Sequence, residues 1–127
     1  MRRAIVGGIV AVLLFDTLAS WASAATGFAY TNVAPGSWLI YAAVGYVAAR
    51  QRDLLAAVAA GAIVGLVDAS AGWALSWAIG PGRLPGLVLT PTRWIQVALI
   101  VVVTAAGMAV IGGLVARFTR TRVSPTA

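Results

Sequence analysis

Long apolar segments dominate the chain, and short clusters of arginine, proline and glycine separate them. A bilayer core of about 30 Å needs about 20 apolar residues in a helix, so each long segment predicts a membrane-spanning helix. Four segments qualify, at residues 4–26, 35–49, 54–79 and 93–116. The second is short for a span and could begin a few residues earlier or continue into the RQRD turn. The pattern predicts an all-α integral membrane protein with four transmembrane helices.

The first segment also imitates a secretory signal peptide. MRR precedes an apolar run, and Ala22-Ser23-Ala24 has the small residues of a cleavage site. Asp16 interrupts the apolar run, however, and the segment matches residues 56–78, which cannot be a signal. We therefore expect the first helix to be retained.

Composition supports a membrane protein. Charged residues make up 9% of the chain, where an ordinary soluble domain has about 25%. The mean hydropathy is +0.97, more apolar surface than a soluble fold of this size could bury. All the basic residues are arginines at the ends of apolar segments, a pattern of membrane topology and not of a nucleic-acid footprint. We expect a lipid bilayer as partner, no nucleic acid, and a bacterial-type inner membrane with several passes.

The distribution of arginines predicts the orientation of the helices. Seven fall on one side of the predicted spans: Arg2, Arg3, Arg50, Arg52, Arg117, Arg120 and Arg122. Only Arg83 and Arg93 fall on the other side, so both termini are expected in the cytoplasm. All tryptophans lie near the predicted outer ends, where an interfacial belt would place them: Trp21, Trp38, Trp73, Trp77 and Trp94.

An internal duplication is visible in the sequence. Asp16 and Trp21 are matched 52 residues later by Asp68 and Trp73, and PGSWLI is matched 56 residues later by PTRWIQ. We expect one membrane domain, 1–127, of two helical hairpins, 1–50 and 51–117, followed by a cytoplasmic tail, 118–127. Because each hairpin has two helices, both would insert in the same orientation, as parallel repeats around an axis along the membrane normal.

The two repeated aspartates are the candidate site. Asp16 lies about 18 Å and Asp68 about 21 Å from the cytoplasmic edge of the core, at 1.5 Å per residue. A lone aspartate at such depth costs about 2.5–3.5 kcal/mol on insertion scales, and an intramembrane acid is by default an ion or proton site. The pseudo-twofold axis would place the two carboxyls at similar depth, where they could share a proton.

Small residues predict where the helices touch. One stripe of the third segment combines small and polar residues at spacings of three and four, and its glycines permit close helix approach. The predicted packing positions are Gly61, Gly65, Gly72, Ala109 and Gly113. The possible supporting polar residues are Ser20, Ser76 and Thr104.

Two functional classes remain open. The chain has no His, Cys, Lys or Glu, so we expect no enzyme, no catalytic residue, no metal site and no cofactor. The first interpretation is a proton- or cation-linked transporter or channel that uses Asp16 and Asp68. Four helices are few to enclose a pathway, so a homodimer or larger homo-oligomer is expected. The alternative is a structural or accessory protein that binds partner helices through its small-residue faces, with a protein partner possible but not identified.

Overall fold

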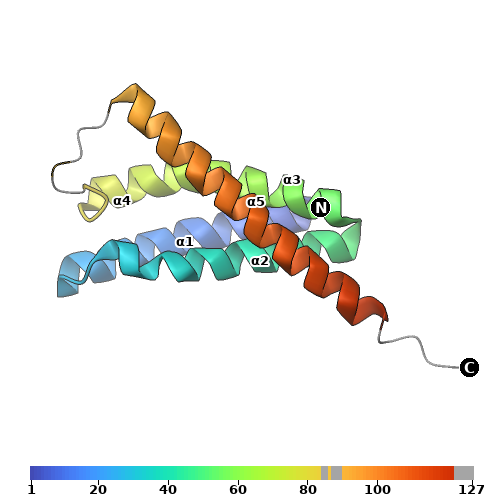
Figure 1. Cartoon of the computed structure of the whole chain (residues 1–127). Coiled ribbons are helices and arrows are strands. Elements are labelled where there is room, and N and C mark those ends of the chain that lie inside the picture. The colour runs from blue at the N-terminus through green and yellow to red at the C-terminus, as the bar shows by residue number, and fades with distance from the viewer. Residues whose placement is uncertain (84–85, 87–89, 122–127) are drawn as a thin grey trace, which may run out of the picture.

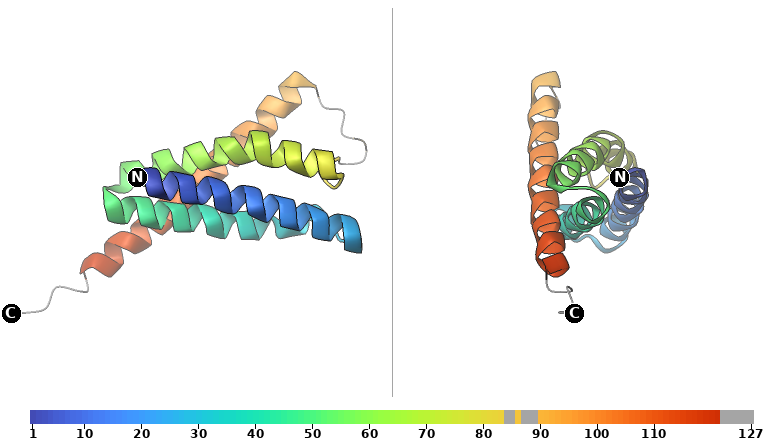
Figure 2. Two further views of the ribbon diagram at one scale, coloured as in Figure 1. Left: turned by 180° about the vertical axis from the view of Figure 1, so that it is seen from behind. Right: turned by 90° about the vertical axis from the view of Figure 1, so that its right-hand side faces the viewer.

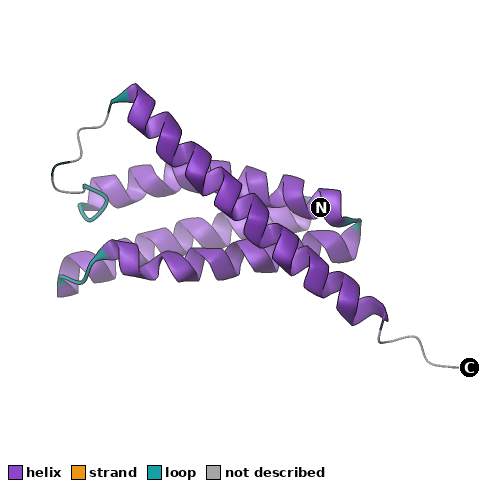
Figure 3. Ribbon diagram, in the orientation of Figure 1, coloured by secondary structure: helices purple, strands orange, loops and turns teal. Residues whose placement is uncertain are grey.

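The computed structural model describes residues 1–83, 86 and 90–121, and every regular element among them is a helix (Figure 3). The first helix, α1, covers Arg2–Thr26 and ends at Gly27, whose φ of 75° suits a residue without a side chain. A 3₁₀ turn at Tyr30–Val33 leads into α2, Ala34–Gln51, which has a proline in its first turn. The all-helical fold predicted from the sequence is confirmed for the described residues.

The third apolar segment forms one long helix with a local change of geometry. It starts with α3, Leu54–Val67, where the Asp53 carboxylate accepts a hydrogen bond of 2.7 Å from the Ala56 amide. A π-helical turn, Asp68–Gly72, follows, and α4 completes the helix at Trp73–Ile79. The last helix, α5, covers Pro91–Thr121. Part of the expected tail is therefore helical, and residues 122–127, with Arg122, lie outside the described residues.

The helices form a bundle of three with a fourth lying across it. α1, α2 and the α3–α4 helix run side by side, and α5 crosses over α2 and α3 at a steep angle (Figures 1 and 2). Along the described chain α5 contacts neither α1 nor α4, whereas α2 does contact α3. If the two hairpins were related by symmetry, a contact between α5 and α1 would match the contact between α2 and α3. The arrangement therefore does not confirm the internal duplication.

The interior consists mainly of small residues. Ala48, Ala57, Ala60 and Ala105 are fully buried, whereas large apolar side chains such as Leu55 are exposed, in that case by 76%. The core of a soluble protein would instead bury the large apolar side chains. In a membrane the lipid tails are as apolar as leucine, so helices pack against one another through their small residues. Three helices are long and apolar enough to cross a membrane: Arg2–Thr26, Leu54–Ile79 and Pro91–Arg120.

The helix α2 differs from the other long helices in composition. Its 18 residues give a length of about 27 Å, close to the thickness of a bilayer core. It is the least apolar of the long helices because proline, serine, two tyrosines, Arg50 and Gln51 fall within it. Only the other three helices meet the length and composition of a span.

Glycines bring α5 into backbone contact with its neighbours. A methyl group on Gly45 would overlap the Ala109 backbone, and one on Gly112 would overlap the Ala42 carbonyl. Gly61 also approaches α5 closely, since a methyl there would overlap Cβ of Ala109 and lie 2.8 Å from the Ala105 carbonyl oxygen.

Met1 and the end of α5 lie at the same end of the bundle. The amino group of Met1 donates a hydrogen bond to Gln51, and the Arg120 guanidinium donates one to the Arg50 carbonyl. The start of α1, the turn between α2 and α3, and the end of α5 therefore meet there (Figure 1). We call this the basic end, because six of the eight described arginines belong to these segments: Arg2, Arg3, Arg50, Arg52, Arg117 and Arg120.

Candidate functional site

Asp16 lies on the inner face of α1. That face repeats every three or four residues, and its members Val12, Asp16, Ser20 and Ser23 are all buried. Only 2% of the Asp16 surface is exposed. A carboxyl group in this position needs partners inside the bundle, because burying an unpaired charge is costly.

Asp68 begins the π-helical turn. The Trp73 amide donates to the Asp68 carbonyl, which is the i→i+5 bond of a π-helix. Within this turn the Ser70 hydroxyl donates to the Leu66 and Val67 carbonyls, a side-chain contact that competes with regular backbone bonding. Single π turns inside α-helices occur frequently at functional sites.

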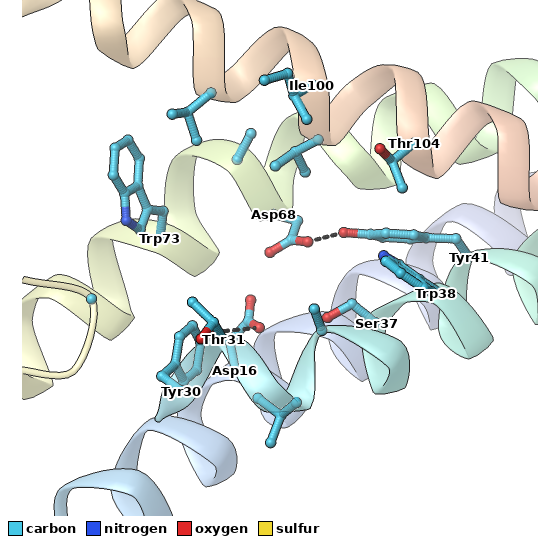
Figure 4. A pocket seen from close by; sticks show the side chains of 16 residues that line it. Asp16, Tyr30, Thr31, Ser37, Trp38, Tyr41, Asp68, Trp73, Ile100 and Thr104 are labelled. Carbon is cyan, nitrogen blue, oxygen red and sulfur yellow. Dashed lines mark hydrogen bonds between the residues drawn. The ribbon is translucent and has the colours of Figure 1, made fainter. Parts of the chain in front are cut away.

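The π turn changes which side chains share a face. At 100° per residue an α-helix would leave Trp73 about 140° away from Asp68. In a π turn residues five apart come close to alignment, so Asp68 and Trp73 both face the same cavity (Figure 4). The α-helical angle does hold in α1, where Trp21 is 69% exposed while Asp16 is buried.

The two carboxyl groups meet each other. Asp16 and Asp68 are direct neighbours, because Oδ2 of Asp16 and Oδ1 of Asp68 border the same glycine, Gly72. Gly72 borders the meeting point: a methyl group there would lie 2.6 Å from Oδ1 of Asp68 and closer still to Oδ2 of Asp16. The absence of a side chain at this position therefore leaves the space in which the pair forms.

A tyrosine hydroxyl caps each end of the pair. Tyr30 donates a hydrogen bond of 3.0 Å to Oδ1 of Asp16, and Tyr41 donates one to Oδ2 of Asp68 (Figure 4). The order of groups is Tyr30, Asp16, Asp68, Tyr41. Oδ2 of Asp16 is buried and has no donor from any other described residue. A proton held between the two carboxyls would supply that donor, and two adjacent carboxylates sharing one site cannot both remain charged at low cost.

Two buried serines adjoin the Tyr30 hydroxyl. Ser20 and Ser76 are fully buried near this hydroxyl, and neither serine hydroxyl has a hydrogen-bond partner within the described residues. Gly82 covers Ser76, since a methyl at that position would be 2.7 Å from the serine hydroxyl. Burial raises the pKa of Tyr30 above its usual value, and the neighbouring Asp16 carboxyl raises that pKa further. Tyr30 therefore remains a hydrogen-bond donor.

A cavity of about 400 Å³ reaches the aspartate pair. It lies between α1, α2, the π turn and α5, in the half of the bundle away from the basic end, and Figure 4 shows its lining. Its polar lining includes Asp16, Tyr30, Ser37, Tyr41, Asp68 and Thr104. Its aromatic and apolar lining includes Trp38, Trp73, Val97 and Ile100. Asp68 is half-buried beside this space, whereas Asp16 is almost completely enclosed.

The other expected site residues divide between the cavity and the helix contacts. Thr104, which was expected as a supporting polar residue, lines the cavity from α5. Gly61 and Gly65 pack on Ala105 and Ala109, and Gly113 packs on Leu54 and Ala57. Gly72 has a different neighbour, because the carboxyl groups and not a helix backbone approach it most closely.

The tryptophans do not form one group. Trp38 and Trp73 line the cavity, although Trp38 is also partly exposed, whereas Trp21 and Trp94 are exposed and lie outside the cavity lining. Trp77 lies under the Arg83 guanidinium, 4.7 Å from the ring centroid. The interfacial belt stays a prediction for all five.

Sequence reasoning missed both tyrosines and Ser37. Tyr41 is the clearest case, because it is 2% exposed in the middle of an apolar helix. A buried tyrosine hydroxyl usually finds a hydrogen-bond partner, so a tyrosine inside an apolar segment is a signal for a polar group on a facing helix. Tyr30, in a loop 14 residues after Asp16, gives no such signal in the sequence.

No group of three or more His, Cys, Asp or Glu side chains that could hold a metal ion occurs within the described ranges.

The fold and the site together define an all-helical, membrane-type bundle with a paired-carboxyl cavity. No protein-family model, curated protein or solved structure matches the chain.

Proposed function

We propose that this chain is a small membrane transporter or channel, linked to protons or cations, in which Asp16 and Asp68 form the proton-binding site. The observation that carries the proposal is the pair of adjacent carboxyl groups beside Gly72, whose outer oxygens are capped by tyrosines. If one proton lies between the two acids, every carboxyl oxygen of the pair has a hydrogen-bond partner. Loss of that proton would leave two adjacent negative charges, which favours binding of a proton or another cation in its place.

The cavity supplies a route to the pair. Asp68 borders the open space while Asp16 lies behind it, so a proton would enter at Asp68 and be shared with Asp16. The walls offer hydroxyls at Ser37 and Thr104, which could order water along this route. This order of events gives the two acids different roles in spite of their similar sequence surroundings.

The proposal includes the orientation expected from the arginines. All four long helices would span a bacterial-type inner membrane as two parallel hairpin repeats, with the basic end in the cytoplasm and the cavity opening to the other side. The chain has no cysteine, so single cysteines introduced at either end can test this directly. A membrane-impermeant thiol reagent added to intact cells should label a cysteine at Arg83 and not one at Arg52.

The decisive experiment measures proton flux in liposomes that contain the purified chain. A potassium gradient with valinomycin drives protons, and a trapped pH-sensitive dye reports their entry; a sodium gradient in parallel tests another cation. Asp16→Asn and Asp68→Asn should each reduce the flux at least tenfold while the fold persists, because an asparagine amide can donate to the remaining carboxylate. Asp53→Asn is the matched control, since Asp53 is the third acid and lies at the basic end.

Equal flux in Asp16→Asn, Asp68→Asn and wild type would refute the assignment. If the wild type carries no ion and the alanine variants of these acids melt well below it at both pH 5 and pH 8, the pair is structural. The accessory-protein interpretation would then take its place.

A further inference from the structure

A second cavity lies at the basic end, outside the aspartate site. It has a volume of about 360 Å³ and lies where the α2–α3 turn meets the end of α5. Its polar lining consists of Arg52, Asp53, Arg117 and Arg120. Its apolar lining consists of Ala49, Leu54 and Leu55.

The backbone around this cavity positions two of its arginines, one through its side chain and one through its main chain. The Arg120 guanidinium donates to the Arg50 carbonyl, which fixes it over the last turn of α2. The Arg52 amide donates to the Ala48 carbonyl at 3.0 Å, which fixes the turn that carries its side chain. Arg117 lies one turn before Arg120 on α5, so the two project from the same stretch of helix. Three guanidinium groups thus converge from two parts of the chain.

Their charge is not balanced within the described part of the protein. The cavity has one acid, Asp53, and its Oδ1 is engaged by the Ala56 amide as the cap of α3. None of the three arginines forms an ion pair with an acid of the described residues. Guanidinium groups bind phosphate oxygens through paired hydrogen bonds, so an unbalanced cluster of this kind favours a phosphate anion.

The surroundings of the cavity distinguish a lipid from a free anion. Leu55 on its rim is 76% exposed, and the adjoining face of α5 is also apolar and exposed at Ile111, Leu114 and Val115. A free phosphate would use only the arginines, whereas a phospholipid would place its phosphate on them and its chains along this face. Basic pockets at the cytoplasmic ends of membrane helices can bind anionic headgroups.

We propose that this cavity binds the phosphate of an anionic phospholipid, with Arg52, Arg117 and Arg120 as its ligands. The lipid would join the α2–α3 turn to the end of α5, the two segments that form the cavity. The proposal does not depend on transport by the aspartate pair.

The test is lipid binding to the full chain in detergent micelles, followed by native mass spectrometry during titration with phosphatidylglycerol. Arg117→Gln combined with Arg120→Gln should weaken binding roughly thirtyfold, from the typical contribution of an arginine near an anionic surface. Arg83→Gln combined with Arg93→Gln removes the same charge at the opposite end and should bind as the wild type does. Arg52→Gln, in an exposed turn, should weaken binding roughly fivefold even if the first double variant does not fold.

Three results would overturn the proposal. Equal losses in the two double variants would indicate a general effect of net charge. Equal binding of phosphatidylcholine would show that the anionic headgroup is not recognised. Displacement of the lipid by millimolar inorganic phosphate would identify a site for a free anion.

Discussion

Replacement of Gly72 by alanine should separate the two carboxyl groups. The added methyl would lie 2.6 Å from Oδ1 of Asp68 and closer to Oδ2 of Asp16, whereas ordinary van der Waals contact begins near 3.4 Å. Each oxygen must therefore retreat by about 0.8 Å or more, too far for the proposed shared proton to lie between the two carboxyls in a good hydrogen bond. The variant should fold, because the methyl meets side chains that can turn away.

The expected cost follows from two opposing terms. Loss of a hydrogen bond that involves a charged group costs about 1.5–3 kcal/mol. Alanine is favoured over glycine inside a helix by about 1 kcal/mol. Gly72→Ala should therefore lower the free energy of unfolding by about 0.5–2 kcal/mol.

The assay is reversible unfolding in mixed micelles of a mild detergent and dodecyl sulfate, followed by far-ultraviolet circular dichroism. Gly7→Ala is the matched control, because a methyl there has nothing within 4 Å. Removal of the Asp16 carboxyl should free space, so the cost of Gly72→Ala should become smaller in an Asp16→Ala background. A cost that is unchanged in that background, or absent in the single variant, would refute the proposed contact.

Two further predictions concern the helix contacts and the tyrosine cap. Gly112→Ala should destabilise the protein by about 1–3 kcal/mol, because its methyl would overlap a backbone carbonyl of α2 that no rotamer change can move. Gly107→Ala, whose methyl would enter open space, should be neutral or stabilising in the same unfolding assay. The raised pKa of Tyr30 means that stability is fully present below the unfolded-state pKa of about 10 and falls as the pH rises above it. Melting temperatures between pH 9 and 11.5 should decline less steeply for Tyr30→Phe than for wild type or Tyr46→Phe; equal slopes would contradict this assignment.

The helices could be predicted from the sequence because membrane helices follow from local composition. A run of about 20 apolar residues satisfies its own backbone hydrogen bonds wherever it is placed, so its existence does not depend on its neighbours. The segments that became α1, the α3–α4 helix and α5 were therefore recognisable. The α2 segment was already short in the sequence, and its polar residues leave it the least apolar of the four.

The aspartate site could be predicted only in part. Asp16 and Asp68 were identifiable because a carboxyl group in an apolar helix requires compensation from somewhere. Their closeness to each other, however, depends on the packing of α1 against the π turn. Both tyrosine donors come from other elements, and no spacing along the chain connects them to the acids.

The sequence by itself determined an all-helical chain with membrane-type composition and two acids in apolar surroundings, because these properties depend on residues that are neighbours in the chain. Only the tertiary structure decided that α5 crosses the other helices, that a π turn brings Trp73 to the face of Asp68, and that Gly72 leaves space for two carboxyls. The physical reason is that helix crossing, local helix geometry and hydrogen-bond partners are set by contacts between segments distant in sequence.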